Sequence, residues 1–367
     1  MKNAYQRWAC GLLAGIALLL ALCAAVVYKV DPFCYYRMPT DWKPVFFDER
    51  SQAVAFIKHA PADTVLLGTS MGANYRAGLI GETFGGTAAR VTLPDGYLSE
   101  FDAAMDTVFR YQTPERVIFS LDANILHRDE SGISNTMPLY LYNDDPVDDV
   151  KYLLNKDALY YSAFVLMSNR WGGVVPQEEA FTWDEGIWWN HMTALDNYQR
   201  PDIVETPLAP DAWFPETDAN LAVVERWVTE HPETEFHIFF PPYSILFWDK
   251  TARLGQTEAT FAMLERACER LLQHDNVQVY GFLMDAGIVE NLDNYCDYVH
   301  HSGEVCQWVL ADIAAGENRL TEENLHETLA NWQEFVVNYN YDQFWDDSFW
   351  YAWNWNAQQQ MENEVTG

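Results

Sequence analysis

Basic residues are scarce in this sequence. Its 22 Lys and Arg residues face 54 Asp and Glu residues over 367 positions, so the formal net charge is −32. A polyanion of this kind repels phosphate backbones, which argues against nucleic acid as a partner. Cysteine is also rare, because six cysteines without a C-x-x-C pair are too few for a disulfide scaffold or a zinc site. The histidines show no ligand-like spacing, and we expect neither a metal nor a cofactor.

Charged residues are absent from one long stretch near the N-terminus. The twenty residues from Ala9 to Tyr28 carry no charge, and as a helix they would span about 30 Å, the thickness of a bilayer's hydrocarbon core. Lys2 and Arg7 precede the run, which favours a cytoplasmic N-terminus. We therefore predict a cytoplasmic tail (1–8), a single-pass transmembrane signal-anchor (9–28) in the lipid bilayer of the cell membrane, and an extracytoplasmic main domain. A cleaved signal peptide, ending near Cys23, is the alternative.

Apolar runs alternate with amphipathic patterns along the rest of the chain. Short buried strands are expected at residues 63–67, 90–93, 116–121, 235–240 and 276–280. Apolar residues at helical spacing lie between them, for example Leu98, Phe101, Met105 and Val108. This alternation predicts an α/β fold with a parallel sheet covered by helices on both faces.

Two segments depart from this alternation. Residues 125–215 form a long insertion, with a helix-like part from Val150 to Ser168 and a Trp-rich part, which we interpret as a lid or substrate-binding cap. The C-terminal segment (317–367) is rich in aromatic residues, with eleven between Trp332 and Trp355. These side chains could stack on sugar rings, lie at a membrane interface, or simply pack against the domain.

Three residues form a candidate catalytic set. Ser70 follows the first expected strand and precedes an expected helix from Met71 to Ile80, so its hydroxyl would project at the carboxyl edge of the sheet. A serine needs a base to take its proton. Asp297 and His300 are three positions apart, which lets the carboxylate orient one imidazole nitrogen and leave the other for serine. His301 has no carboxylate at that spacing.

These motifs resemble those of a known family. Gly68-Thr69-Ser70-Met71, the segment from Phe240 to Leu246, and Asp297-Tyr-Val-His300 together resemble SGNH (GDSL-type) hydrolase-like proteins of the bacterial envelope. They are distantly similar to teichoic acid D-alanyl transfer and alginate O-acetylation proteins. The resemblance covers roughly residues 60–310 and departs from the family pattern in having Gly-Thr-Ser in place of Gly-Asp-Ser.

The resemblance implies a flavodoxin-like three-layer α/β/α sandwich, expected here over residues 45–316, with a triad of Ser70, His300 and Asp297. It also implies oxyanion-hole residues, for which Gly96 and Asn124 are the candidates. The motif Gly68-Thr-Ser-Met-Gly72 fits an α/β-hydrolase nucleophile elbow as well, but this serine follows the first strand of the domain rather than a later one.

Two functions remain open from the sequence. The first is a membrane-anchored serine esterase or O-acyltransferase that acts on a cell-envelope polysaccharide or a teichoic-acid-like polymer. The second is an inactive SGNH scaffold that binds a glycan or assists a membrane-bound O-acyltransferase. A disulfide between Cys296 and Cys306, which bracket the Asp297–His300 loop, is also left open.

Overall fold

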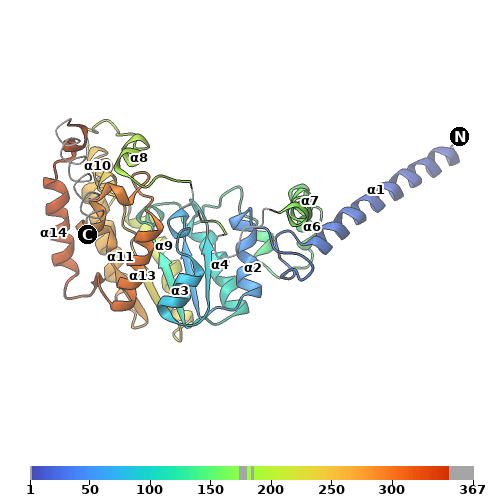
Figure 1. Cartoon of the computed structure of the whole chain (residues 1–367), viewed down its shortest axis with the longest axis horizontal. Helices are drawn as coiled ribbons and strands as arrows, with labels where there is room; N and C mark the ends of the chain where they lie inside the picture. Colours follow the sequence, from blue (N-terminus) through green and yellow to red (C-terminus); the bar gives the residue numbers. More distant parts are fainter. Residues whose placement is uncertain (1, 173–179, 183–185, 347–367) are drawn as a thin grey trace, which may run out of the picture.

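The N-terminal helix projects from an α/β domain (Figure 1). The computed structural model describes residues 2–172, 180–182 and 186–346. Helix α1 (Lys2–Val30) contains a stretch, Ala4–Val30, that is long and apolar enough to cross a membrane. Its side chains are mostly exposed along this stretch, whereas Val27 and Val30 at its end are buried against the domain.

The domain is built on one six-stranded sheet with the order β2-β1-β3-β4-β5-β6. The first five strands run parallel, and the short strand β6 is antiparallel to β5. The five expected strands are confirmed to within two residues at each end, whereas the two-residue strand β6 was not expected. The strands are β1 (Thr64–Gly68), β2 (Ala88–Thr92), β3 (Arg116–Ser120), β4 (Glu235–Phe239), β5 (Val277–Tyr280) and β6 (Arg319–Leu320).

Helices flank the sheet, as the apolar patterns predicted. Helices α2, α4, α9, α11 and α14 follow one another as packed neighbours, and α3 packs against α13. The strand order 2-1-3-4-5 is the flavodoxin-like one, in which the chain leaves β1 and β3 in opposite directions and opens a crevice between their carboxyl ends. The helices that pack in this way are α2 (Glu49–His59), α3 (Ala77–Phe84), α4 (Leu98–Tyr111), α9 (Phe214–Glu230), α11 (Thr257–Leu271), α13 (Gly303–Ala315) and α14 (Leu325–Asn338).

The remaining helices complete the described chain. The α-helices are α5 (Ala123–Leu126), α6 (Asp149–Leu153), α7 (Lys156–Trp171), α8 (His191–Asp196), α10 (Ile245–Arg253) and α12 (Ala286–Val289). The 3-10 helices are η1 (Ser70–Gly72), η2 (Leu139–Leu141), η4 (Phe282–Met284), η5 (Leu292–Asn294) and η6 (Tyr341–Trp345).

Two helix expectations were wrong in their bounds. The segment expected to be one helix from Met71 to Ile80 is the short η1 followed by α3. The two are separated because the Tyr75 side chain between them is buried in the core, with its ring centroid 5.7 Å from that of Phe239. The helical stretch expected from Val150 to Ser168 is two helices. It breaks at Asn155, whose side chain caps α7 by accepting hydrogen bonds from backbone N–H groups.

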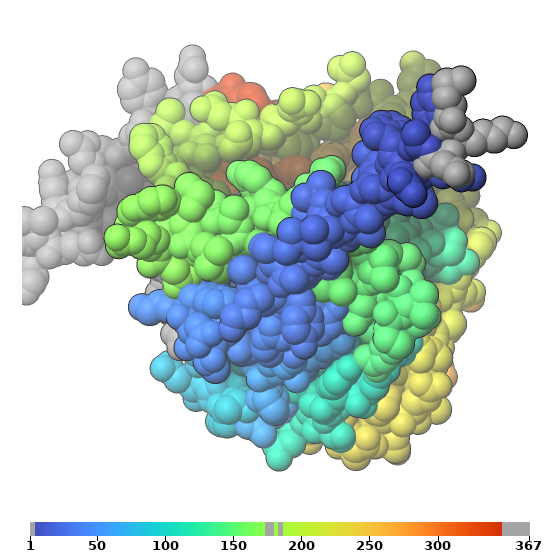
Figure 2. Space-filling model, turned by 90° about the vertical axis from the view of Figure 1, so that its right-hand side faces the viewer, coloured from blue at the N-terminus to red at the C-terminus, as the bar shows by residue number. Residues whose placement is uncertain are grey.

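The segment expected to form one insertion (125–215) packs at two separate sites on the domain. Helices α6 and α7 pack against α1, on the face from which α1 emerges (Figure 2). Helix α8 instead packs against η5, next to the Asp297–His300 loop. Trp183 of the Trp-rich part lies outside the described residues.

The described part of the C-terminal segment packs against the domain. The Trp332 ring lies 6.1 Å from that of Trp248, and Phe344 is buried. The cation of Arg200 lies over the half-exposed ring of Trp345. The remaining aromatic residues of this segment, from residue 347 onward, lie outside the described residues.

Candidate active site

Ser70 lies in a tight turn at the carboxyl end of β1. The turn is narrow because Gly68 and Gly72 approach closely, and a Cβ atom on Gly68 would lie 2.8 Å from the Cα atom of Gly72. The side chain of Thr69 accepts a hydrogen bond from the backbone N–H of Met71 and so fixes the start of η1. The Ser70 side chain is left partly exposed at the edge of the sheet.

The loop between η5 and α13 carries Asp297 and His300. Its ends are joined by a β-bridge between Tyr295 and His301, and Cys296 N–H donates to the carbonyl of His300. Inside the loop, one oxygen of Asp297 accepts hydrogen bonds from the backbone N–H groups of Val299 and His300, at 2.8 and 2.7 Å. The three-residue spacing therefore closes a compact turn around the carboxylate.

Ser70, His300 and Asp297 meet although 230 positions separate the serine from the histidine. Ser70 Oγ lies 2.8 Å from His300 Nε2, and His300 Nδ1 lies 2.6 Å from Asp297 Oδ2. Since an ionised carboxylate only accepts hydrogen bonds, the Nδ1 atom that faces Asp297 carries a proton, and Nε2 faces the serine hydroxyl group. Burial raises the pKa of Asp297, but the hydrogen bond and charge of His300 and the two backbone N–H groups outweigh it and leave this pKa lowered.

His301 has a different environment from its neighbour. Its imidazole is buried, with Nδ1 3.3 Å from the carbonyl oxygen of Ser302 and 3.7 Å from Cys306 Sγ. Burial lowers the pKa of His301 to about 4. All six cysteines lie within the described residues and none forms a disulfide, so Cys296 and Cys306 are both buried and not joined to each other.

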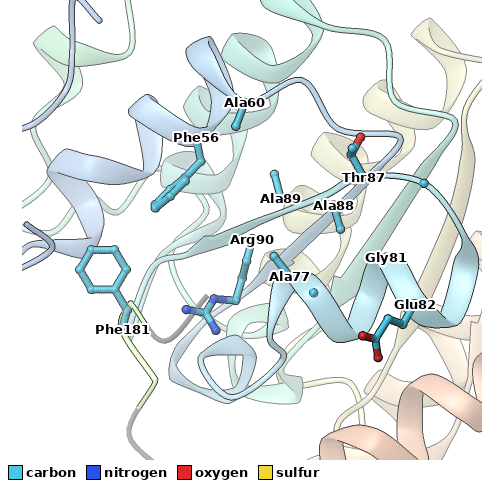
Figure 3. A pocket seen from close by; sticks show the side chains of 12 residues that line it. Phe56, Ala60, Ala77, Gly81, Glu82, Thr87, Ala88, Ala89, Arg90 and Phe181 are labelled. Carbon is cyan, nitrogen blue, oxygen red and sulfur yellow. The ribbon is translucent and has the colours of Figure 1, made fainter. Parts of the chain in front are cut away.

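Several hollows in the surface of the described residues could hold a ligand, and two of them are relevant to the choice of a substrate site. One, of about 580 Å³, lies beside the Asp297–His300 loop and is lined by Asp297, Thr193, Asn197 and the exposed ring of Trp188. The other, of about 480 Å³, lies beside the edge strand β2 between α2 and α3 (Figure 3), and contains none of the three candidate catalytic residues. The first hollow is therefore the one that adjoins the Ser70 site.

One group of side chains offers metal-ligand atoms. The oxygens of Glu265 and Glu269 and a ring nitrogen of His326 lie within 4.8 Å of one another, on α11 and α14. Two of the three residues are exposed, and none belongs to the Ser70 site.

Within the described residues, no hydrogen bond joins either candidate oxyanion-hole residue, Gly96 or Asn124, to Ser70. The backbone N–H of Gly96 donates to the carbonyl of Leu93 at 2.8 Å, so this N–H is already used inside a turn. Asn124 is exposed on α5 and lines a small recess with His127 and Trp213. These residues were placed by resemblance alone, and their assignment to the oxyanion hole stays a prediction.

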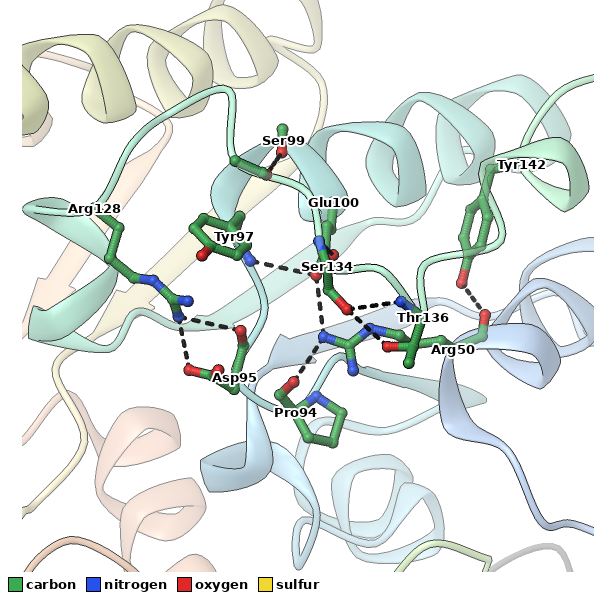
Figure 4. Close-up of polar contacts among 11 residues, drawn as sticks. Arg50, Pro94, Asp95, Tyr97, Ser99, Glu100, Arg128, Ser134, Thr136 and Tyr142 are labelled. Carbon is green, nitrogen blue, oxygen red and sulfur yellow. Dashed lines mark hydrogen bonds and ion pairs between the residues drawn. The ribbon is translucent and has the colours of Figure 1, made fainter.

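The loop that contains Gly96 is held by a buried ion pair (Figure 4). Glu100, on the first turn of α4, is fully buried and lies 3.1 Å from Arg50 of α2. The same carboxylate accepts hydrogen bonds from the backbone N–H groups of Tyr97 and Ser134, and Arg50 also donates to the carbonyl of Pro94. The loop after β2 is therefore fixed to α2 and to the start of the insertion.

Asp122 is a site residue that sequence reasoning missed. It follows β3, is 5 % exposed, and its carboxyl group is hydrogen bonded by the hydroxyl groups of Thr69 and Tyr243. Burial raises the pKa of Asp122, and the two hydroxyl donors oppose this only in part. The available signal was its position two residues after a parallel strand, which places it at the same sheet edge as Ser70.

No model of a known protein family matches this sequence, and no curated protein matches it. Among solved structures, a protein of Streptococcus pneumonia provisionally described as a platelet activating factor is similar over 84 % of this chain and 97 % of its own. The identity is 10 % and the TM-score 0.37. A provisionally described acylhydrolase from Bacteroides fragilis is similar over 76 % of this chain and 95 % of its own, with 9 % identity and a TM-score of 0.32. At such values the chemistry has to be argued from the site itself.

Proposed function

We propose that this protein is a membrane-anchored serine esterase or O-acyltransferase of the SGNH type that works outside the cytoplasmic membrane. The observation that carries the proposal is the continuous contact from Ser70 Oγ through the His300 ring to Asp297, with distances of 2.8 and 2.6 Å. A serine, a histidine and a carboxylate in this order make up the catalytic machinery of acyl transfer on several unrelated folds.

The proposed reaction begins with attack of Ser70 Oγ on the carbonyl carbon of an acyl ester. His300 Nε2 takes the serine proton as the new C–O bond forms, and Asp297 stabilises the imidazolium. The Ser70 N–H, at the first residue of η1, donates to the oxygen that becomes negatively charged. The ester C–O bond then breaks, and His300 returns the proton to the leaving alcohol.

In the second half of the reaction, the acyl group is transferred from Ser70 to an acceptor by the same steps in reverse order. His300 takes a proton from water or from a sugar hydroxyl group, and the oxygen of that group forms a bond to the acyl carbon. The bond between the acyl carbon and Ser70 Oγ then breaks, and His300 returns the proton to Oγ. The proposed substrate is an acyl ester of a cell-envelope polysaccharide or a teichoic-acid-like polymer. The hollow beside Asp297 supports this choice, because Trp188, which is 76 % exposed there, offers a flat apolar face for a sugar ring.

An inactive SGNH scaffold, assisting a membrane-bound O-acyltransferase, is the second candidate. The observation that favours it is the oxyanion side of the site, where the Gly96 N–H is already bonded to Leu93 and Asn124 lines a separate recess. Loss of a single oxyanion donor typically costs 10²- to 10³-fold in rate.

Labelling with a fluorophosphonate probe separates the two functions. The full-length protein in detergent should react with the probe, and Ser70→Ala should abolish the reaction. Ser131→Ala, which removes an exposed loop serine bonded only to its neighbour Asp129, is the matched control and should be labelled like the wild type. A folded wild type that is not labelled would favour the scaffold, and equal labelling of Ser70→Ala would exclude Ser70 as the nucleophile.

A further inference from the structure

Helix α7 is apolar on two opposite sides. One side, formed by Ala158, Ser162 and Val165, is buried in the protein. The opposite side carries four large side chains at helical spacings of four, three and four residues, and we call these the exposed stripe. Its members and their exposed fractions are Tyr160 (66 %), Phe164 (41 %), Met167 (52 %) and Trp171 (73 %). A surface helix ordinarily presents polar residues on the side away from the core. Within the described residues the Phe164 ring contacts Phe47 and the Tyr160 ring contacts its neighbour Tyr161, but each member of the stripe remains at least 41 % exposed.

The position of α7 relative to α1 indicates what that partner is. Val165 of α7 packs with Val30, the last residue of α1, and with Val45. Figure 2 looks onto the face from which α1 emerges, and α7 lies across this face at the base of α1. Since α1 is the helix that is long and apolar enough to span a bilayer, a membrane crossed by α1 would lie over the same face.

The joint between α1 and the domain is built to hold this arrangement. Asp31, directly after α1, is buried and accepts hydrogen bonds from the backbone N–H groups of Tyr35, Tyr36 and Arg37 at 2.9–3.0 Å. It also accepts one from the Tyr152 hydroxyl of α6 at 2.8 Å. Helix α1 is therefore joined to the domain by a hydrogen-bonded turn, and this turn fixes the distance between the exposed stripe and the end of α1.

Further bonds fix α7 itself to the connector after α1. The Asn169 side chain exchanges two hydrogen bonds with the backbone of Lys43, and the Tyr161 ring stacks on Phe47 at 3.9 Å. These contacts determine which side of α7 faces outward, so the orientation of the exposed stripe follows from the packing.

The charges around the stripe suit a lipid surface. The chain has 54 acidic residues, yet α7 contains none after Asp157 in its first turn. Arg170 lies in its last turn, and Lys156 at its start pairs with Asp157 at 2.7 Å. Tyr and Trp are favoured at the boundary between headgroups and acyl chains, and basic side chains are attracted to anionic headgroups. A protein partner would need neither the absence of acidic residues nor this mixture of aromatic and basic side chains.

We propose that α7 is an interfacial helix whose exposed stripe lies in the headgroup region of the bilayer that α1 crosses. The inference rests on the membrane anchoring in the proposed function and extends it, because the domain is then held with one face against the membrane. A helix with an apolar face that includes Tyr, Phe and Trp is suited to bind in the plane of an interface.

The test uses the full-length protein in liposomes of phosphatidylcholine and phosphatidylglycerol. Cys10 and Cys23 are changed to alanine, and the other four cysteines are buried. A polarity-sensitive fluorophore is attached at Met167→Cys in the stripe or, as the matched control, at Val337→Cys, which is 62 % exposed on α14. We expect a blue-shifted emission at 167 that is quenched by lipids with a nitroxide near the headgroup and not by aqueous iodide. The label at 337 should behave in the opposite way.

Each other outcome overturns the proposal. Quenching of both labels by iodide alone would mean that the stripe faces water. Protection of the label at 167 without quenching by lipid nitroxide, lost when the protein is diluted in lipid, would mean that a second copy covers the stripe. A third label at Leu20→Cys, in the middle of α1, must be quenched by a nitroxide deep in the acyl chains. If it is not, the membrane anchoring has failed, and this failure is distinct from that of α7.

Discussion

The hydroxyl group of Thr69 is hydrogen bonded to the buried carboxyl group of Asp122, directly beside the candidate nucleophile. Thr69 comes from the turn after β1 and Asp122 from the turn after β3, so the contact joins the two strand ends between which the sheet opens. Tyr243 donates to the other oxygen of the same carboxyl group. Asp122 thereby ties the serine turn to two further segments of the fold.

Replacing Asp122 should weaken both stability and the serine turn. In Asp122→Ala the hydroxyl groups of Thr69 and Tyr243 lose their acceptor, and we expect the free energy of unfolding to fall by about 2–4 kcal/mol. Chemical denaturation of the full-length protein in detergent measures this. Asp129→Ala, which removes an exposed loop carboxylate, is the control and should change the stability by less than about 0.5 kcal/mol. If Asp122→Ala had the same free energy of unfolding as the control, the Asp122 carboxyl group would not stabilise the turn that contains Ser70.

The candidate triad should behave as a unit in ester hydrolysis. Ser70→Ala and His300→Ala should each remove nearly all activity on a model ester, and the double variant should lose little more. Asp297→Asn should cost up to about 10⁴-fold if the analogy with serine proteases holds, because the ring would take the wrong tautomer. The readout is kcat/KM with matched protein amounts.

His301→Asn is the control for a general requirement for histidine in this loop. Its ring is buried and faces Ser302 and Cys306 rather than Ser70, so its effect on kcat/KM should be much milder than that of His300→Ala. Equal losses in the two variants would argue against His300 as the specific base.

The ion pair that holds the loop after β2 should be costly to break. Glu100→Ala leaves the Arg50 side chain, which is 12 % exposed, without its carboxylate and leaves two backbone N–H groups without an acceptor. We expect a loss of about 3–5 kcal/mol in the free energy of unfolding. Lys156→Ala, which breaks an exposed ion pair with Asp157, should cost no more than about 1 kcal/mol. If the two variants melt at the same temperature, the buried network does not stabilise this loop.

Acid should destabilise the protein through His301. Its pKa is lowered from 6.5 to about 4 in the folded state, so the unfolded state binds the proton more readily. The corresponding stability is fully present above pH 6.5, is lost as the pH falls from 6.5 to about 4, and changes no further below that. The shift corresponds to about 3 kcal/mol. Denaturation measured over this range should show one proton fewer taken up on unfolding of His301→Asn than of the wild type. Equal proton uptake would mean that the ring is protonated alike in both states.

The proposed topology is tested in cells. A reporter enzyme fused after Gly367 should be active only when the reporter folds outside the cytoplasm, and the chain should stay in the membrane fraction. Recovery of a soluble secreted form that starts near residue 24 would mean that the N-terminal segment is a cleaved signal.

Much of the fold was predictable because its determinants are local. The apolar runs at 63–67, 116–121 and 235–240 contain enough Val, Ile, Leu and Phe to be buried strands wherever they lie, and they became β1, β3 and β4. The bounds of helices were less secure. The run after Ser70 has helical spacing, but burial of Tyr75 in the core interrupts it, and that burial depends on Phe239, which is far away in the sequence.

The sequence by itself determined the contact between Asp297 and His300, because three residues of chain suffice to close it through backbone N–H groups. It also determined the apolar run that forms α1, since length and composition alone make a helix able to span a bilayer. The strand after which Ser70 lies follows from the same local patterns.

Only the tertiary structure decided that Ser70 Oγ meets His300 Nε2 across 230 positions, and that Asp122 lies behind the serine turn. It likewise decided that the Gly96 N–H is used within its own turn and that the apolar side of α7 faces outward at the base of α1. The physical reason is the same in each case. Parallel strands bring distant loops to one edge of the sheet. Packing between elements then determines which groups face each other, and the spacing of residues along the sequence contains no information about that packing.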